Sequence, residues 1–459
     1  MDAWRGKRVT VMGLGRFGGG VGVTRWLARQ GARVLVTDQA PAEKLSSSLA
    51  AIRDLDVALR LGAHDERDFR DADAVVVNPA IPDRSPFVQA ALAAGVPITT
   101  EINLFVERCP ARCVGVTGSV GKSTVTAMIG GVLEARPDGR AWVGGNLGDS
   151  LLPALESIRP NDVVVLELSS FQLHRTPLVR WSPHVAVITN VTVNHLDWHG
   201  TFAAYVADKL NIVRFQEPGR DWAVVHDTPD LRRRFDELFG DNAGLYRYRL
   251  DGDTPAAAAQ TTSAAEHDDV RLRWEGLALA APGRHNRENA AAALAVAHLL
   301  GVEREAALAA LARFEGLPHR LKRVGERGGV TYVDDSKSTT PEAALTAIDS
   351  IDGPLLLILG GYDKGSDLTA LARRAAQRAR LCACIGRTGP AIADAIAVAG
   401  GAAQRCDTLG EAVAACRAAA RPGDTVLLSP GCASWDMFED YRARGMQFAR
   451  LALEGRGTP

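Results

Sequence analysis

Short runs rich in Val, Ile and Leu alternate with alanine-rich stretches of helical periodicity along almost the whole chain. Continuous apolar runs bounded by turn residues are typical of strands buried on both faces, as in a parallel sheet. The alternation therefore predicts α/β layers in which parallel sheets dominate. The predicted strands are 8–13, 33–38, 73–79 and 96–100, then 112–118, 161–170, 184–190 and 221–226, and finally 330–336, 354–361, 381–386 and 424–430.

This pattern starts afresh at two places, which divides the chain into three predicted domains. A new strand begins at "RCVGVTG", and the pattern restarts after "FEGLPHRLKRV". Between these points the polar stretch 251–270 predicts an irregular excursion, and 285–302 predicts a helix. At 459 residues the chain is also longer than one hydrophobic core usually serves. We therefore predict domains over residues 1–100, 101–317 and 318–459.

Composition and charge argue against several classes of protein. The formal net charge is -1 with acidic and basic residues interspersed, so we expect no broad basic surface for nucleic acid or an anionic membrane. No apolar run reaches the roughly 18 to 20 residues that span a bilayer, and the first residues lack the apolar core of a signal peptide. The seven cysteines lack the familiar metal or redox spacings. We expect reduced thiols in a cytoplasmic enzyme.

A glycine-rich turn follows the first predicted strand. Gly13, Gly15 and Gly18 satisfy the spacing G-x-G-x-x-G, and Asp38 ends the next strand, where a ribose partner is expected. Glycines let the backbone approach a diphosphate, and the start of the following helix offers unpaired N–H groups to it. The spacing does not specify a nicotinamide, because a UDP-linked nucleotide can use the same surface. A turn without any ligand also fits it.

A second and different phosphate turn lies between a later apolar strand and a helix. Gly118, Gly121, Lys122 and Ser123 form the pattern G-x-x-G-K-S. The backbone amides of such a turn surround phosphate oxygens, the lysine supplies charge, and the serine hydroxyl suits Mg²⁺. The usual longer pattern requires a glycine where this chain has Val116. A chance Gly-Lys-Ser turn without a nucleotide also fits these residues, although the position between a strand and a helix favours a phosphate site.

The shortened turn and eight further motifs, in order along nearly the whole chain, resemble the Mur ligases. These enzymes add amino acids stepwise to the UDP-linked precursor of the bacterial cell wall. Three of the motifs, "ELSSFQL", "DSKSTTPEAAL" and "SPGCAS", are most similar to the members that add D-glutamate to UDP-N-acetylmuramoyl-L-alanine. The eight motifs are "GGNLG" at 144–148, "ELSSFQL" at 167–173, "NVTVNHLD" at 190–197, "PGRHNRENA" at 282–290, "GLPHR" at 316–320, "DDSKSTTPEAAL" at 334–345, "GGYDKG" at 360–365 and "LSPGCASWDMF" at 428–438.

The resemblance implies a fold and a reaction. The fold is α/β, with a Rossmann-like N-terminal domain for the UDP substrate, a central domain like a P-loop ATPase, and a Rossmann-like C-terminal domain that carries the amino acid as it closes. The implied reaction transfers the γ-phosphate of ATP to the substrate carboxylate, and the amine of D-glutamate then displaces phosphate from the acyl phosphate. The implied cofactors are ATP and two Mg²⁺ ions. The implied partners are small-molecule substrates, without nucleic acid or membrane, for a monomeric enzyme of peptidoglycan synthesis in the cytoplasm.

Two alternative functions stay open at this point. One is another Mur-type amide ligase, which adds L-glutamate or a different amino acid. The other is a nicotinamide-dependent oxidoreductase, which the first glycine-rich turn alone would suggest.

The resemblance also implies roles for individual residues. Lys122 is expected to hold the transferring phosphate, Ser123 and Glu167 to hold one Mg²⁺, and His195 to hold a second. Lys209 matches a lysine that is carbamylated in the family, a change that replaces a cation by an anion near the metal. The catalytic set is Lys122, Glu167, His195, Lys209 and Asn146, and the metal set is Ser123, Glu167, His195 and, if carbamylated, Lys209. The ATP set is Gly118, Ser119, Gly121, Lys122, Ser123, Thr124, Asn286, Asn289, Arg320, Asp335 and Lys364. The UDP-substrate set is Gly13, Gly15, Gly18, Asp38, Asn146 and His319, and the D-glutamate set is Lys337, Thr339, Ser434 and Tyr441.

Several positions allow another interpretation or depart from the family pattern. By spacing alone, His195 and His199 could pair on one helix face to bind a transition metal, but the family match uses only His195. Asn286 also suits a helix N-cap. Asn194 stands where the family usually has an acid, and Val120 where it usually has a polar residue. Asn194 makes the surroundings of the second metal ion less negative than in the family, which bears on the affinity for that ion. Val120 lies in the ATP turn and bears on the affinity for ATP.

Overall fold

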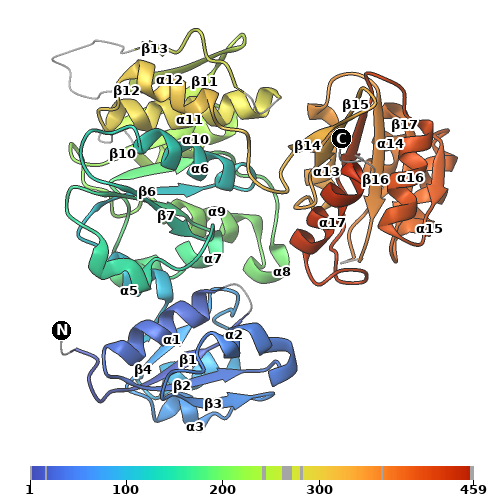
Figure 1. Cartoon of the computed structure of the whole chain (residues 1–459). Coiled ribbons are helices and arrows are strands. Elements are labelled where there is room, and N and C mark those ends of the chain that lie inside the picture. The colour runs from blue at the N-terminus through green and yellow to red at the C-terminus, as the bar shows by residue number, and fades with distance from the viewer. Residues whose placement is uncertain are drawn as a thin grey trace. The chain divides into compact units, whose positions relative to one another are not determined.

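The computed structural model describes residues 3–15, 18–239, 244–260, 271–279, 283–362 and 365–454 (Figure 1). By its internal contacts the chain divides into two compact units. One consists of residues 1–277 and 288–311, and the other of residues 278–287 and 312–459. Each of the three predicted domains contains one sheet, which agrees with the predicted three-domain α/β fold. The exact boundaries at 100 and 317 stay predictions.

The N-terminal sheet is parallel and has the strand order β3-β2-β1-β4-β5. Val9 and Val11 of β1 pack with Leu27 of α1, whereas Met12 packs with Phe69 of α3 on the opposite face. The strand order reverses between β1 and β4, so their carboxyl ends border the crevice where open α/β sheets bind ligands. The strands are β1 Arg8–Met12, β2 Arg33–Asp38, β3 Ala58–Leu61, β4 Ala74–Val77 and β5 Ile98–Thr99. The helices are α1 Gly19–Arg29, α2 Ser46–Ala50, α3 Arg67–Arg70, α4 Pro86–Ala93 and α5 Glu101–Val106, with the 3-10 helix η1 Ala42–Leu45.

The middle sheet has the order β13-β12-β11-β10-β9-β6-β8-β7. The six strands β11, β10, β9, β6, β8 and β7 pair in parallel, and β12 and β13 continue the sheet beyond β11 with antiparallel pairings. The strands are β6 Arg112–Thr117, β7 Ala141–Gly145, β8 Val163–Glu167, β9 Val185–Ile188, β10 Trp222–His226, β11 Gly244–Asp251, β12 Thr254–Gln260 and β13 Arg271–Arg273. The helices are α6 Lys122–Leu133, α7 Ser170–Leu173, α8 Leu196–His199, α9 Phe202–Leu210, α10 Pro229–Phe239, α11 Arg284–Leu299 and α12 Arg304–Ala312, with η2 Leu152–Ser157 and η3 Thr176–Val179.

The C-terminal sheet has the order β14-β15-β19-β16-β17-β18, and only the β14–β15 pairing in it is antiparallel among the described residues. Its central strand β16 is buried on both faces: Leu355 and Leu357 pack with α13, α14 and α15, while Leu356 and Ile358 pack with α16 and α17. The strands are β14 Lys322–Arg327, β15 Val330–Asp334, β16 Leu355–Gly360, β17 Ala379–Ile385, β18 Ala403–Arg405 and β19 Thr425–Leu428. The helices are α13 Pro341–Ser350, α14 Thr369–Arg378, α15 Gly389–Val398, α16 Leu409–Ala419 and α17 Tyr441–Leu453.

The excursion predicted for 251–270 is wrong over its first half. Thr254–Gln260 forms β12, which pairs with β11 in an antiparallel hairpin through the turn at Gly252. Four consecutive alanines carry no alternation of apolar and polar positions, so the sequence pattern did not predict this strand. Residues 261–270 lie outside the described residues. The helix predicted for 285–302 is present as α11.

No helix among the described residues is both long and apolar enough to cross a membrane.

Candidate active site

The second phosphate turn lies where β6 passes into α6. Gly121 is the N-cap of α6 with φ of 86°, and Lys122 is the first residue of the helix. A Cβ atom at Gly121 would lie 2.9 Å from Asn289 Oδ1, and one at Gly118 would lie 1.9 Å from Thr189 Oγ1. Both positions therefore require glycine. The strand-to-helix turn predicted from the glycine spacing is present, and Asn289 of the predicted ATP set lies against it.

Asn190, which directly follows Thr189 after β9, clamps this turn. Its Oδ1 accepts hydrogen bonds from the backbone N–H groups of Ser119 (3.2 Å) and Val120 (2.9 Å), and its Nδ2 donates to the Val120 carbonyl (2.9 Å). The Val120 side chain is exposed, so this position is held through its backbone. The departure at Val120 therefore leaves the clamp intact. Sequence analysis did not single out Asn190, although it begins the motif "NVTVNHLD".

Two lysines converge on one carbonyl of the turn. Lys122 Nζ donates to the carbonyls of Gly118 (3.0 Å) and Ser119 (3.2 Å), and Lys209 Nζ donates to that of Gly118 (2.7 Å). Lys209 is 1% exposed. Burial, together with the nearby Lys122, lowers the pKa of Lys209 well below its ordinary value, although Glu167 acts in the opposite direction. The structure therefore favours a neutral amine at Lys209.

Glu167 ends β8 next to Val116 of β6 and is 2% exposed. Its Oε1 accepts a hydrogen bond from Asn146 Nδ2 (2.9 Å), whereas its Oε2 has no hydrogen-bond partner among the described residues. A buried carboxylate oxygen without a partner is costly unless a cation or a donor meets it. Glu167 is therefore suited to meet a cation at this edge of the sheet. Ser123, the second residue of α6, is also buried.

His195 and His199 have different surroundings. His195 is the exposed N-cap of α8 with φ of 53°, and its ring meets that of Phe171 edge-on at 4.9 Å. Although the residue is exposed, neighbouring side chains such as Phe171 remove water from part of the ring, and this desolvation lowers the pKa of His195, which favours a neutral imidazole. The buried His199 ring bonds Asp208 through Nδ1 (2.7 Å) and Ser170 through Nε2 (3.0 Å). Because both of its nitrogens are engaged, His199 does not pair with His195 as a metal ligand in this arrangement.

The first glycine-rich turn has the backbone that its glycines predict. Gly13 and Gly15 have φ of 91° and 64°, and Gly18 is the N-cap of α1 with φ of 88°. Asp38 ends β2, as expected from the sequence. Its carboxylate accepts hydrogen bonds from the backbone N–H groups of Gly15 (3.1 Å) and Ala40 (2.8 Å). In this structure Asp38 therefore holds the turn itself, and its contact with a ribose stays a prediction.

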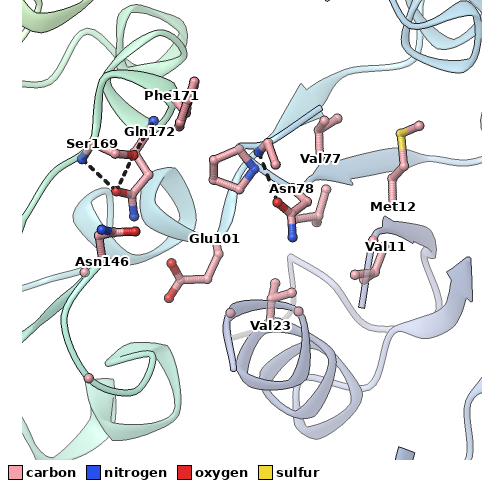
Figure 2. A pocket seen from close by; sticks show the side chains of 18 residues that line it. Val11, Met12, Val23, Val77, Asn78, Glu101, Asn146, Ser169, Phe171 and Gln172 are labelled. Carbon is pink, nitrogen blue, oxygen red and sulfur yellow. Dashed lines mark hydrogen bonds between the residues drawn. The ribbon is translucent and has the colours of Figure 1, made fainter. Parts of the chain in front are cut away.

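A pocket of about 250 Å³ lies between this turn and the loops after β7 and β8 (Figure 2). Gly13, Asn78 and Asn146 line it together with Phe171, which also contacts His195. Figure 2 shows the Glu101 carboxyl group pointing toward the side of the pocket where Asn146 lies. The lining residues with polar side chains are Asn78, Glu101, Asn146, Ser169 and Gln172.

Glu101 is a pocket residue that sequence analysis missed. It is the first residue of α5, and the hydroxyl of Ser150 donates a hydrogen bond to its Oε1. Burial raises the pKa of Glu101 to about 7. No local motif marks this position, because its importance comes from the fold that brings α5 beside the loop after β7.

The second unit brings several predicted residues together. His319, with φ of 62°, bonds Asp334 Oδ2 through its Nδ1 (2.6 Å), and its carbonyl accepts the backbone N–H of Lys337 (3.0 Å). Lys337 Nζ lies 3.9 Å from the centroid of the Tyr441 ring. Burial raises the pKa of Asp335 to about 7. His319, Lys337 and Tyr441 thus belong to one cluster.

Arg444 of α17, also missed from the sequence, holds this cluster together. It is fully buried, and its guanidinium donates to Ser336 Oγ (2.9 Å) and to the carbonyls of Ser336 (2.9 Å) and Cys432 (3.2 Å). Ser336 precedes Lys337, and Cys432 lies two residues before Ser434, so one buried cation ties together the two loops of the predicted D-glutamate set. Burial lowers the pKa of Arg444 to about 10.

The remaining predicted residues have simple positions. Asn286 is the third residue of α11, so its interpretation as the helix N-cap is wrong. Thr339 donates its backbone N–H to the Lys337 carbonyl (2.9 Å), and Ser434 is 2% exposed. Thr124 lies in the first turn of α6. The charge of Arg320 acts to lower the pKa of Asp335, against the effect of burial. Lys364 lies outside the described residues.

Three family profiles match the chain in succession. Residues 7–100 match "Mur ligase MurD-like, N-terminal domain", residues 116–297 match "Mur ligase middle domain", and residues 319–432 match "Mur ligase, glutamate ligase domain".

Curated proteins and solved structures are similar over nearly the whole length. The chain is 40% identical to the UDP-N-acetylmuramoylalanine--D-glutamate ligase of Roseiflexus sp. (strain RS-1), over 97% of this chain and 98% of that protein. It is 38% identical to the ligase of the same name from Symbiobacterium thermophilum, over 97% of each. Among solved structures, UDP-N-acetylmuramate-alanine ligase from Thermotoga maritima aligns with a TM-score of 0.60 at 20% identity, over 97% of this chain and 98% of that one. The structural likeness concerns the fold.

Proposed function

The chain belongs to the Mur ligase family, and from this we propose that it joins D-glutamate to UDP-N-acetylmuramoyl-L-alanine in an ATP-dependent ligation. The curated relatives at 38% and 40% identity are named for this ligation and match along nearly their whole length. The activity belongs to the synthesis of peptidoglycan precursors.

One observation carries the mechanistic part of the proposal: Asn146 borders both candidate nucleotide sites. It lines the pocket beside the first glycine-rich turn, and its side chain donates to Glu167 beside the second turn. A UDP-linked substrate held at Gly13 would thus extend its acid toward Asn146. A triphosphate held at Lys122 would approach the same place from the other side. The two turns therefore serve two nucleotides whose reacting ends meet.

Ligation requires activation of the carboxylate, because oxide is not a leaving group in water. A carboxylate oxygen of the substrate forms a bond to the γ-phosphorus of ATP while the bond to the bridging oxygen breaks, and ADP leaves. Lys122 offsets the charge on the transferring group, and the turn's backbone positions it. The amine of D-glutamate then attacks the acyl carbon and loses a proton, and phosphate leaves to give the amide.

The residues around the second turn fit Mg²⁺. The unpartnered Oε2 of Glu167 and the hydroxyl of Ser123 are oxygen donors, which this hard cation prefers. Ser123 and Glu167 would hold one ion, and His195 with a carbamylated Lys209 would hold the second. Because the described residues contain no group of three or more His, Cys, Asp or Glu side chains placed for a metal, phosphate oxygens and water would complete each coordination sphere. Bound Mg²⁺ would neutralise charge on the phosphates.

Lys209 is proposed to carry a carbamate. Its lowered pKa provides a neutral amine, whose nitrogen adds to the carbon of CO₂ and releases a proton. The product is an anion next to the ammonium of Lys122. This reaction accounts for a lysine buried next to another lysine, an arrangement that is otherwise unfavourable.

The C-terminal residues are proposed to bind the amino acid. Lys337 offers a cation, and Thr339, Ser434 and Tyr441 offer hydroxyl groups, which suit a dicarboxylate. The buried Arg444 bonds Ser336 and Cys432, and so holds together the loops that carry Lys337 and Ser434. We further propose that the enzyme acts as a monomer in the cytoplasm on small-molecule substrates.

A phosphate-release assay with UDP-N-acetylmuramoyl-L-alanine and ATP tests the proposal directly. D-Glutamate, L-glutamate, meso-diaminopimelate and L-alanine are offered separately, and the amide product is identified by mass spectrometry. We expect turnover with D-glutamate only. A preference for L-glutamate would overturn the substrate assignment, and turnover with none of the four would overturn the proposed ligation.

A further inference from the structure

The 80–84 loop, which follows the pocket residues Asn78 and Pro79, is fastened to the middle domain within the first unit. Trp198 Nε1 donates to the Ala80 carbonyl (3.0 Å), and Arg84 donates to the carbonyls of Asp197 and Trp198 (3.0 Å each). The loop therefore bonds α8 directly. His195, from the predicted metal set, is the N-cap of that same helix.

A second connection runs through charged side chains, of which Arg175 is buried. Arg175 is 2% exposed and donates to the Ile81 carbonyl (2.8 Å) and to Asp83 Oδ1 (2.6 Å). His174 joins two carboxylates: its Nε2 bonds Asp83 Oδ2 (2.8 Å), and its Nδ1 bonds Asp208 Oδ1 (2.9 Å). Because ionised carboxylates only accept hydrogen bonds, both ring nitrogens of His174 donate. His174 therefore connects the 80–84 loop to α9.

Asp208 extends these hydrogen bonds from α9 to α8, the two helices beside the second phosphate turn. Its other oxygen accepts from His199 Nδ1 (2.7 Å), and His199 Nε2 bonds Ser170 Oγ (3.0 Å). Asp208 directly precedes Lys209 on α9, and His199 lies one turn after His195. The bonds of Asp208 thus bear on the helices that carry Lys209 and His195.

We propose that His174 and Asp208 are positioning residues for the ligation, which hold α8 and α9, and with them His195 and Lys209, in register with the wall of the UDP-substrate pocket. This inference rests on the proposed function for its catalytic consequence. It assigns no contact with substrate to either residue. A misplacement of about 1 Å at a reacting centre lowers a rate by up to about a hundredfold, so we expect loss of this bridge to lower turnover measurably.

Hydrogen–deuterium exchange of the ligand-free, full-length protein tests the positioning without reference to activity. We compare wild type, His174→Ala and the isosteric Asp208→Asn. We expect peptides that cover 195–211 to exchange about tenfold faster or more in both variants, while peptides that cover α6 keep the wild-type rate. Wild-type exchange at 195–211 in both variants would overturn the proposal.

Asp162→Asn is the matched control for loss of a carboxylate that accepts several hydrogen bonds. Asp162 is 4% exposed and accepts hydrogen bonds from the Arg140 backbone N–H (2.8 Å) and Trp142 Nε1 (2.9 Å), at the opposite end of β8 from Glu167. We expect this variant to be less stable but to exchange like wild type at 195–211. If Asp162→Asn accelerates exchange at 195–211 as much as the other two variants do, the effect comes from general destabilisation, and the proposal is overturned.

Steady-state kinetics then separates positioning from binding of the amino acid. We expect kcat to fall about tenfold or more in His174→Ala and Asp208→Asn, with KM for D-glutamate within about twofold of wild type, and Asp208→Glu to restore part of kcat because it keeps the charge. Wild-type kcat in both variants would overturn the catalytic consequence. If wild type itself forms no amide while the variants still exchange faster, the proposed function fails and the positioning stands.

Discussion

Glu101→Gln should change how the stability of the first unit depends on pH. The carboxyl group of Glu101 lies in the pocket wall with a pKa of about 7 in the folded protein, compared with an ordinary value of 4.5. The folded state therefore keeps a proton that the unfolded chain has lost between these two pH values. Over this interval the free energy of unfolding of wild type falls as pH rises, because the charged carboxylate is less stable in the pocket than in water. Glutamine cannot ionise, so the variant does not show this fall.

The expected magnitude follows from the two values. A difference between about 7 and 4.5 corresponds to roughly 3 kcal/mol at 1.36 kcal/mol per pH unit. Glu101 is only partly buried, so solvent reduces the cost of the charge, and it begins α5, where the helix dipole favours an anion. We therefore expect Glu101→Gln to gain about 2 kcal/mol relative to wild type between pH 4.5 and pH 8.

Urea unfolding of both proteins at pH 4.5, 6 and 8 measures this difference. Tryptophan fluorescence reports mainly on the first unit, because seven of the eight tryptophans, all but Trp435, lie in it. Other titrating groups cancel when the two proteins are compared at the same pH. Ser150→Ala removes the hydrogen bond that lowers the pKa of Glu101 in the folded protein, so in that variant the fall should begin at the same pH but extend to a higher pH. A stability difference between Glu101→Gln and wild type that is the same at all three pH values would refute this reasoning.

Three further predictions concern the two turns and the C-terminal cluster. Lys122→Ala should abolish phosphate release in the ligation assay without loss of the fold, and unchanged turnover would contradict the assigned triphosphate site. Gly22→Ala should destabilise the first unit by about 1–3 kcal/mol in urea unfolding, because the new Cβ would lie 2.5 Å from Ser150 Cβ. The control is Gly131→Ala in α6, whose Cβ would have no atom within 4 Å, so this variant should be neutral or stabilising. Equal effects at both sites would count against the packing argument. Arg444→Met should raise KM for D-glutamate at least about tenfold while KM for ATP changes little, since several buried hydrogen bonds to the two loops are lost; an equal change in both KM values would argue against this role.

The twelve predicted strands and the two phosphate turns were predictable because their signals are local, whereas strands such as β3, β7 and β14 were not predicted. The run at 355–360 is apolar at every position before Gly360, and the structure buries it on both faces as β16. Glycine spacing located both turns, since each needs backbone conformations or close approaches that other residues do not tolerate. Local pattern is enough wherever a residue's role depends on its immediate neighbours in the chain.

The residues that were missed have partners far away in the sequence. Arg444 is one basic residue on a helix until the fold places it against Ser336, 108 residues earlier. Glu101 meets Ser150 only because α5 packs beside the loop after β7, and His174 finds Asp83 across 91 residues. Similarly, β12 consists largely of alanine and is a strand because β11 pairs with it. No pattern within one segment contains this information.

The central claim is that the γ-phosphate of ATP, held at the turn that ends in Lys122, is transferred to the carboxylate of the UDP-linked substrate. Isotope transfer tests this step most directly, with UDP-N-acetylmuramoyl-L-alanine labelled with ¹⁸O in its alanine carboxylate. If an acyl phosphate forms, each amide made is accompanied by inorganic phosphate that carries one ¹⁸O atom from the substrate. Amide formation with phosphate free of the label would contradict the account.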